Sequence, residues 1–273
     1  MKYLFDYWEK IEKEIADKYI YIFLEYDGTI VPFARRPDQA VIPDANKELL
    51  KRLSLNLQCE VAIISGRKLS DIKQMVGLRN IIYSGNHGLE VEGPNIKFKS
   101  FILFKYEKTL SEIKKQLQDE LSVIPGAWVE DKGLSLSVHY RLVASQKIPQ
   151  VKIVFQEATI IDRLKGLIKT KSGKMILEIQ PPVVWDKGKI VLWLLARQTF
   201  LRDEQIILPI YVGNNLADED AFRVLRNKGL TVCIGESKGS LAEYYLNNSR
   251  EVAELLQRIL RWLKIAQKQF DTI

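Results

Sequence analysis

Apolar residues along the chain form short continuous runs and longer segments with helical spacing. The run from Tyr19 to Leu24 holds only aromatic and aliphatic side chains, so it predicts a strand buried on both faces of a parallel sheet. Further apolar runs predict strands at 61–64, 81–83, 206–212 and 230–234. Helical spacing predicts a helix over 3–17, a second that begins at 43 and a third that ends at 76. It also predicts helices over 187–200 and 248–263. This alternation of strands and helices is typical of a doubly wound α/β sheet.

The pattern changes over residues 101–180. Its predicted elements are a helix through 121, strands at 127–131 and 134–141, a helix over 151–164, and strands at 167–170 and 175–179. A helix followed by a pair of strands, occurring twice in succession, is typical of an α+β unit. We therefore expect an inserted domain at 101–180, with a core domain formed by 1–100 and 181–273.

Polar residues follow the predicted core strands directly. They are Glu25 and Asp27, Ser65 and Arg67, Asn86 and His87, and Asn214 and Asp218, with Lys187 at a helix start. In an α/β sheet the carboxyl ends of the strands border one ligand crevice, so these side chains are expected to meet there. Carboxylates suit Mg²⁺, and lysine and serine suit phosphate oxygens, so the set predicts phosphoryl transfer.

Each of these residues has a simpler interpretation when it is taken alone. A surface or helix-capping role explains any one of them, and Asp27-Gly28 between apolar runs is typical of a hairpin. Pro32 and Pro37 argue against a second strand after this turn. The polar residues stand together at successive element boundaries, and this joint position favours a shared ligand-binding site over separate surface or capping roles.

Composition restricts the class of protein. The chain has 273 residues, 47% hydrophobic and 27% charged, as expected of a globular fold. Cys59 and Cys233 lie in or beside apolar runs, so we expect core residues rather than a disulfide framework or a zinc site. The net charge of +7 comes from scattered lysines, which favours a solvated surface over nucleic-acid binding.

The sequence also sets expectations about location and partners. Residues 1–18 lack the apolar core of a signal peptide, and no run approaches the roughly 20 apolar residues of a membrane span. We expect a cytoplasmic monomer with a small-molecule substrate, without a nucleic-acid or membrane partner.

Five segments carry a resemblance to a known family. They read Phe-Leu-Glu-Tyr-Asp-Gly-Thr at 23–29, Ile-Ser-Gly-Arg at 64–67, Gly-Asn-His-Gly-Leu-Glu at 85–90, Asp-Lys-Gly-Lys at 186–189 and Gly-Asn-Asn-Leu-Ala-Asp-Glu-Asp-Ala-Phe at 213–222. Together they resemble the motifs of trehalose-6-phosphate phosphatases, which are haloacid-dehalogenase-like phosphatases. The resemblance spans about residues 19 to 263.

The resemblance implies a Rossmann-like core with an inserted, mobile α/β cap domain, Mg²⁺ as cofactor and a phosphosugar as substrate. It implies that the residue at the position of Glu25 attacks phosphorus, that Asp27 protonates the leaving oxygen and then activates water, and that Ser65 and Lys187 hold the phosphoryl group. The implied metal-binding residues are Glu25, Asp27, Asn214 and Asp218. The implied substrate-binding residues are Arg67, Asn86 and His87 in the core and Glu130, Lys132, Arg141 and Glu178 in the cap.

Three positions depart from the family pattern. The family has aspartate where this chain has Glu25, Asn214 and Asn215. A side chain longer by one methylene displaces the attacking oxygen by roughly 1 Å, and errors of that order cost about a hundredfold in rate. The resemblance thus implies a weakened phosphatase that hydrolyses trehalose 6-phosphate to trehalose and phosphate. Two alternatives stay open: a sugar-phosphate-binding protein that does not turn its ligand over, and a phosphatase for a different phosphosugar.

Overall fold

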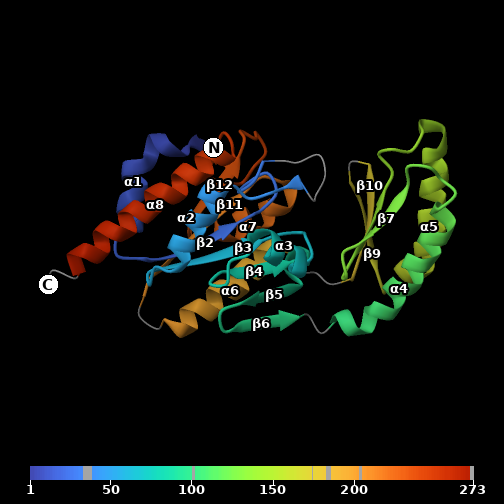
Figure 1. Ribbon diagram of the computed structural model, residues 1–273, viewed down its shortest axis with the longest axis horizontal. Helices are drawn as coiled ribbons and strands as arrows, with labels where there is room; N and C mark the ends of the chain where they lie inside the picture. The colour runs from blue at the N-terminus through green and yellow to red at the C-terminus, as the bar shows by residue number, and fades with distance from the viewer. Residues whose placement is uncertain (33–38, 100–101, 174, 183–185, 203–204, 271–273) are drawn as a thin grey trace. The chain divides into compact units, whose positions relative to one another are not determined.

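The chain folds into two compact units. In this computed structural model the described residues are 1–32, 39–99, 102–173, 175–182, 186–202 and 205–270. The first unit is formed by Met1–Lys97 and Trp185–Ile273, and the second by Phe98–Val184. Each unit has its own sheet and its own helices (Figure 1).

A nine-stranded sheet forms the centre of the first unit. Its order is β1 (Lys2–Tyr3), β13 (Tyr244–Leu246), β12 (Leu230–Ile234), β11 (Ile207–Gly213), β2 (Tyr19–Leu24), β3 (Cys59–Ile64), β4 (Ile82–Gly85), β5 (Glu90–Gly93) and β6 (Ile96–Lys99). In this spatial order, all neighbouring strands from β1 at the edge through β4 pair in parallel. Strand β5 pairs antiparallel with β4. Because β2 lies between β11 and β3, the chain order reverses there, which places a topological switch point at the end of β2.

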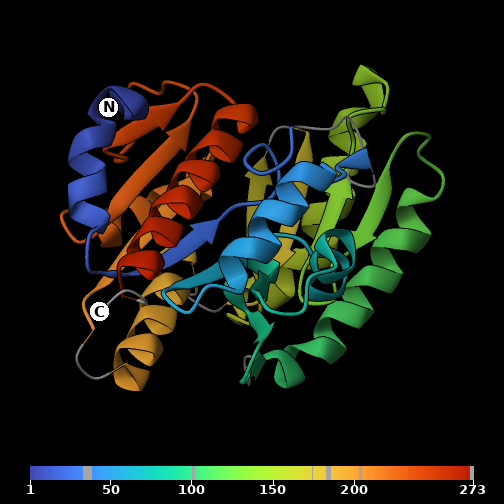
Figure 2. The ribbon, with the colours of Figure 1, turned by 60° about the vertical axis from the view of Figure 1, so that its left-hand side comes forward.

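Helices cover both faces of this sheet. They are α1 (Trp8–Ile15), α2 (Asp44–Ser54), α3 (Leu69–Val76), α6 (Lys187–Leu201), α7 (Glu219–Leu225) and α8 (Ser249–Phe270). Figure 2 shows α2 and α8 side by side over one face, where Ile22 of β2 joins the main core. On the other face, Phe23 stacks on Tyr211, which meets Phe222 of α7 edge-on. Both faces of β2 are therefore buried, which explains its continuous apolar run.

The second unit has a separate core. Its sheet has the order β7 (Trp128–Asp131), β8 (Leu136–His139), β10 (Ile176–Gln180) and β9 (Lys169–Gly173), with each pair antiparallel. Its helices are α4 (Ile102–Leu121), a short 3-10 turn at Ser145–Lys147, and α5 (Ile148–Leu164). Leu117, Val138 and Ile179 are fully buried between the helices and one face of the sheet.

Some predicted elements differ from the structure at their ends. The helix predicted over 3–17 begins only at Trp8, because residues 2–3 pair with β13 and a 3-10 turn, Leu4–Tyr7, follows. The strand predicted at 134–141 ends at His139, so Arg141 lies in a turn. The strand predicted at 167–170 is shifted to Lys169–Gly173, because the hairpin register opposes Gly173 to Ile176.

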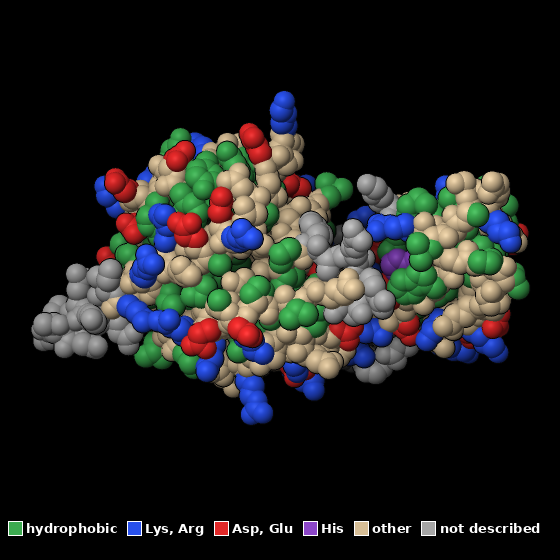
Figure 3. All heavy atoms as spheres, turned by 45° about the horizontal axis from the view of Figure 1, so that its top comes forward, with side chains coloured by type: hydrophobic (Ala, Val, Ile, Leu, Met, Phe, Trp, Pro, Cys, Tyr) green, Lys and Arg blue, Asp and Glu red, His purple; other side chains and the backbone are tan. Residues whose placement is uncertain are grey.

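Two surface features bear on partners. Lys and Arg side chains are interspersed with Asp and Glu on the face drawn in Figure 3, as expected of a solvated surface. Within the described residues, no helix has the length and apolar composition required to cross a bilayer.

Candidate active site

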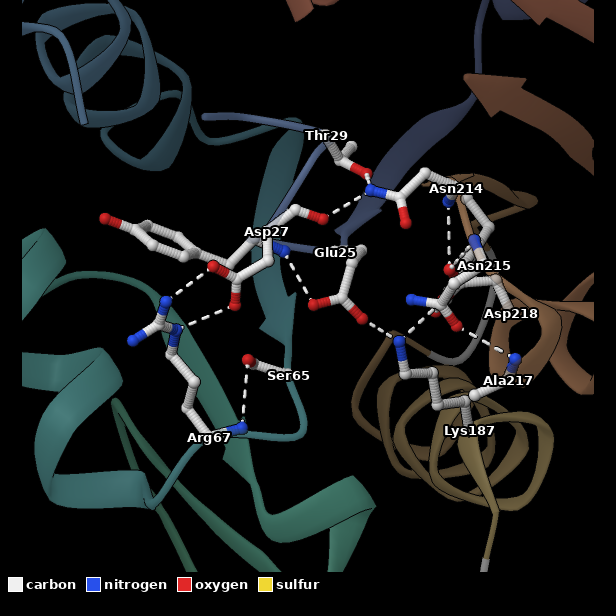
Figure 4. Close-up of polar contacts among 12 residues, drawn as sticks. Glu25, Asp27, Thr29, Ser65, Arg67, Lys187, Asn214, Asn215, Ala217 and Asp218 are labelled. Carbon is white, nitrogen blue, oxygen red and sulfur yellow. Dashed lines mark hydrogen bonds and ion pairs between the residues drawn. The ribbon is translucent and has the colours of Figure 1, made fainter. Parts of the chain in front are cut away.

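The predicted core residues meet at the carboxyl ends of β2, β3 and β11 (Figure 4). Glu25 directly follows β2, Ser65 follows β3, and Asn214 follows β11. Lys187, the first residue of α6, completes the group from the side of the helix. The switch point thus brings together segments almost 190 residues apart in sequence.

Lys187 is the centre of a buried ionic cluster. Its side chain is 2% exposed, and its Nζ contacts the carboxylates of Glu25 and Asp218, the latter at 2.7 Å. The second Glu25 oxygen, Oε1, accepts a hydrogen bond from the Tyr26 amide at 3.0 Å. Both Glu25 oxygens are therefore engaged. Burial lowers the pKa of Lys187, and the nearby Asp218 carboxylate partly offsets this shift.

The carboxylate of Asp218 is held by four donors. It accepts from Lys187 Nζ, from Tyr211 Oη at 2.7 Å, and from the amides of Asn214 and Asn215 at 2.9 and 3.0 Å. A carboxylate has about four acceptor sites, so these donors saturate it. Gly213 makes the arrangement possible, since a Cβ there would collide with this carboxyl group. The geometry favours an organising role for Asp218; metal binding by it stays a prediction.

Asn214 has one satisfied and one unsatisfied end. Its Nδ2 donates to the backbone oxygen of Asp27 and to Thr29 Oγ1, the latter at 3.0 Å. These two acceptors fix which end of the amide is nitrogen. Its Oδ1 is buried and has no hydrogen-bond partner among the described residues. A buried oxygen without a donor is costly, so this atom is a place for a cation or for a donor from a ligand.

Asp27 and Arg67 form a bidentate pair beside this cluster. Arg67 Nε and Nη2 donate to the two Asp27 oxygens at 2.7 and 2.5 Å. The Asp27 side chain is 33% exposed, so it is the more accessible carboxylate of the site. Ser65, fully buried, accepts from the Arg67 amide at 3.2 Å, which leaves its own proton free to donate.

Asn86 lies near the site, on the loop after β4. It begins a 3-10 turn, Asn86–Gly88, with a φ of +49°. Its backbone N–H donates to the Arg67 carbonyl at 2.7 Å, and its side-chain Nδ2 donates to Glu90 at 2.9 Å. Its side-chain Oδ1 is buried without a partner in the described part of the chain. The side chain of His87 is outside the described residues, so the prediction for it stays a prediction.

The cation predicted for this site must be tested against the donors present. No cluster of three or more His, Cys, Asp and Glu side chains that could hold a metal occurs within the described residues. Oxygen donors of other kinds are present, however. The Asp27 carbonyl is bonded to Asn214 Nδ2, and the Oδ1 of Asn214 is unpartnered among the described residues; Figure 4 shows both residues around the same space as Glu25. Mg²⁺ prefers oxygen ligands and is usually bound through only one or two carboxylates. This set of oxygen donors therefore fits Mg²⁺, although it brings little negative charge to the ion.

The sheet of the second unit has a polar face that gathers three of the predicted sugar contacts. Lys132 Nζ lies 3.8 Å from Glu130 Oε2 and 3.4 Å from Glu178 Oε1. His139 Nε2 lies 2.9 Å from Glu130 Oε2. Arg141 is exposed in the turn after β8 and has no hydrogen bond or ion pair to this cluster within the described residues.

Three residues, Thr29, Tyr211 and Trp128, were not predicted from the sequence as members of a site. Thr29, in the turn after β2, and Tyr211, inside β11, each contact a predicted residue. His139 and Trp128 lie on the polar face of the second unit. For Trp128 the signal was period-two spacing, since Glu130 two residues later was already a candidate.

Comparisons with known proteins agree on one family. The profile of the trehalose-phosphatase family matches residues 23–250. Trehalose-phosphate phosphatase B of Arabidopsis thaliana is 32% identical over 266 residues, which cover 93% of this chain and 70% of that protein. Probable trehalose-phosphate phosphatase D of the same plant is 34% identical over 270 residues, with 94% and 72% covered.

A solved structure shows the same fold. The C-terminal domain of trehalose-6-phosphate phosphatase from C. albicans superposes with a TM-score of 0.75 at 22% identity, covering 95% of this chain and 98% of that one. The α/β fold class and the resemblance predicted from the motifs are thus confirmed. With the profile match over most of its length, the chain belongs to the trehalose-phosphatase family.

Proposed function

We propose that this protein is a weakened, Mg²⁺-dependent phosphatase that hydrolyses trehalose 6-phosphate to trehalose and phosphate. The observation that carries the proposal is the buried meeting of Glu25, Lys187, Asp218 and Asn214 at the switch point. Membership of the trehalose-phosphatase family supports the substrate. The first unit is the catalytic core, and the second is the cap that recognises the sugar.

The proposed chemistry uses two carboxylates in different environments. Glu25 attacks phosphorus and forms a phospho-enzyme as the bond from phosphorus to the sugar oxygen breaks. The more exposed Asp27, once it has left its pair with Arg67 and taken a proton from solvent, gives that proton to the leaving sugar oxygen. Asp27, now a carboxylate, then takes a proton from the water that releases phosphate from Glu25. Lys187 and Ser65 hold the phosphoryl oxygens through an ammonium and a hydroxyl.

The proposed cation is held by Glu25, the carbonyl of Asp27 and Oδ1 of Asn214. When bound, it neutralises negative charge on the phosphoryl oxygens. The unpartnered Oδ1 is the observation that supports this assignment. We assign Asp218 to organising the site, since its carboxylate is already saturated by Lys187 and three other donors.

The same contacts explain why the rate is expected to be low. Glu25 contacts the ammonium that is proposed to hold the phosphoryl group, so substrate competes with Glu25 for Lys187. Its other oxygen is held by the Tyr26 amide. A nucleophile held in this way is displaced from the position that a shorter aspartate would take.

In the cap, Glu130, Lys132 and Glu178 are proposed to bind sugar hydroxyls. Carboxylates accept from hydroxyls and the ammonium donates to them, and Lys132 Nζ already lies within 3.8 Å of both carboxylates. Arg141 is proposed as a further contact of the cap. Arg67, Asn86 and His87 are proposed contacts in the core.

The test is phosphate release from trehalose 6-phosphate in the presence of Mg²⁺. We expect slow turnover that EDTA abolishes and that Asp27→Asn reduces further. Glucose 6-phosphate serves as the comparison substrate. Faster turnover of glucose 6-phosphate than of trehalose 6-phosphate would reject the proposed substrate.

The second candidate function is a binding protein that retains the sugar-phosphate pocket without turnover. The contact between Glu25 and Lys187 favours it, because it occupies both proposed catalytic groups. Calorimetric binding of trehalose 6-phosphate together with undetectable phosphate release would establish this alternative.

The pH dependence of phosphate binding provides an independent check on Lys187. Since burial lowers the pKa of Lys187 from the usual 10.5, the ammonium loses its proton, and the binding it provides, at a pH below 10.5. Tyr211 does not interfere, because burial raises its pKa well above 10. We expect affinity for inorganic phosphate to fall on this alkaline side, and Lys187→Arg to remove the fall, as arginine stays charged. A decline seen only above pH 10.5 would contradict the assignment.

A further inference from the structure

A tryptophan on the polar face of the second unit has no role in the chemistry above. Trp128 is 47% exposed, although it is one of the largest apolar side chains. Its ring stacks on the imidazole of His139, with centroids 3.9 Å apart and planes 6° from parallel. Since His139 covers one face of the indole, the exposed area belongs to the ring edges and the opposite face. An aromatic surface of this kind is a common binding element for flat apolar groups.

The orientation of this indole is fixed by a chain of contacts. Glu130 Oε2 lies 2.9 Å from His139 Nε2, which holds the imidazole plane, and the imidazole in turn holds Trp128. Glu130 also lies 3.8 Å from Lys132. A ring held in place before the ligand arrives loses little freedom on binding, so its contact contributes more to affinity.

The strand register sets polar groups beside the ring. Trp128 is opposite His139, and the next pair on the same face is Glu130 opposite Ser137, with Glu178 opposite Ser137 on the other side. Residues two apart on a strand share a face and are about 7 Å apart, close to the width of a pyranose ring. A pyranose has C–H groups on its faces and hydroxyls around its rim. The indole, with the Glu130 carboxylate beside it on the same strand, complements both.

We propose that Trp128 is a stacking platform for a pyranose ring of the phosphosugar and thereby determines specificity for the sugar part of the substrate. This inference rests on the proposed function. It assigns to Trp128 a contact with the apolar face of the sugar, while Glu130, two residues along the same edge strand, binds its hydroxyls. His139 is the positioning residue that holds the platform.

Calorimetric titration of the full chain tests the platform, with Asp27→Asn in every protein to stop turnover. We expect Trp128→Ala to weaken binding of trehalose 6-phosphate about tenfold, without changing the affinity for inorganic phosphate. Trp128→Phe, which keeps an aromatic face, is expected to stay within about threefold of the parent. Ile161→Ala is the matched control, because Ile161 is also exposed in this unit, on α5, and lies away from the polar face.

The outcomes separate the platform from the proposed substrate. Unchanged trehalose 6-phosphate affinity in Trp128→Ala overturns the platform and leaves the proposed function intact. Binding of a different pyranose phosphate, weakened by Trp128→Ala, upholds the platform and rejects trehalose 6-phosphate as the substrate. If the parent binds inorganic phosphate but no pyranose phosphate more tightly, both proposals fall. Equal losses in Trp128→Ala and Trp128→Phe, with matched thermal unfolding, also overturn an aromatic role.

Discussion

Replacing both Glu25 and Asn214 by aspartate is expected to raise kcat for trehalose 6-phosphate by about a hundredfold. The shorter side chain at 25 moves the attacking oxygen away from Lys187, which then becomes available to the phosphoryl group. The carboxylate at 214 adds a charge beside the proposed cation. Phosphate release with saturating Mg²⁺, compared among the parent, the two single variants and the double variant, measures the gain. An unchanged kcat in the double variant would place the defect elsewhere.

Asn214→Asp alone gives a readout that does not depend on turnover. The amide of Asn214 donates to the Asp27 carbonyl, whereas a carboxylate would place an oxygen against that oxygen. We therefore expect Asn214→Asp to lower the melting temperature in EDTA and to recover it with Mg²⁺ to a greater extent than the parent. Asn215→Asp is the matched control, because among the described contacts its side chain serves as the cap of the next turn, accepting from the Ala217 amide. Equal Mg²⁺ responses in both variants would contradict the site.

Lys187→Met is expected to give the largest loss of stability, about 3–5 kcal/mol in the free energy of unfolding. The change removes the only cation that contacts both Glu25 and Asp218 in the described contacts, and it leaves two buried carboxylates without it. Phosphate binding is expected to be lost as well. Urea unfolding and phosphate titration measure the two effects.

Two further variants separate charge from packing at position 187. Lys189→Met removes a more exposed lysine on the same helix, 3.5 Å from Asp186, and is expected to change stability by about 0.5 kcal/mol or less. Adding Glu25→Gln to Lys187→Met is expected to recover part of the loss, because one carboxylate no longer needs the ammonium. A similar loss in Lys187→Met and Lys189→Met would show that the buried cluster does not stabilise the core.

The sequence predicted the fold class because its strongest signal, the six-residue run of β2, is also the centre of the sheet. Strands β1 and β13 escaped prediction, since two or three residues are too few to show any periodicity. Their pairing depends on contacts between distant parts of the chain. The same cause shortened the first helix, whose start at Trp8 follows from the pairing of Tyr3 with Tyr245.

At the site, strand ends predicted which residues meet but not how they are bonded. The contacts of Glu25 with Lys187 and of Asn214 with the Asp27 carbonyl depend on side-chain lengths within a folded crevice. Asp218 shows the limit most clearly. Two of its four donors are backbone amides, and their directions have no signature in residue identity.

The separate cores of the two units have a consequence for how the sequence of such a protein can evolve. The groups proposed for bond breaking pack with the first core, and those proposed for recognising the sugar belong to a unit with its own buried residues. Substitutions that silence one activity therefore leave the scaffold of the other undisturbed. A lineage can lose its chemistry and still retain a receptor for the same metabolite.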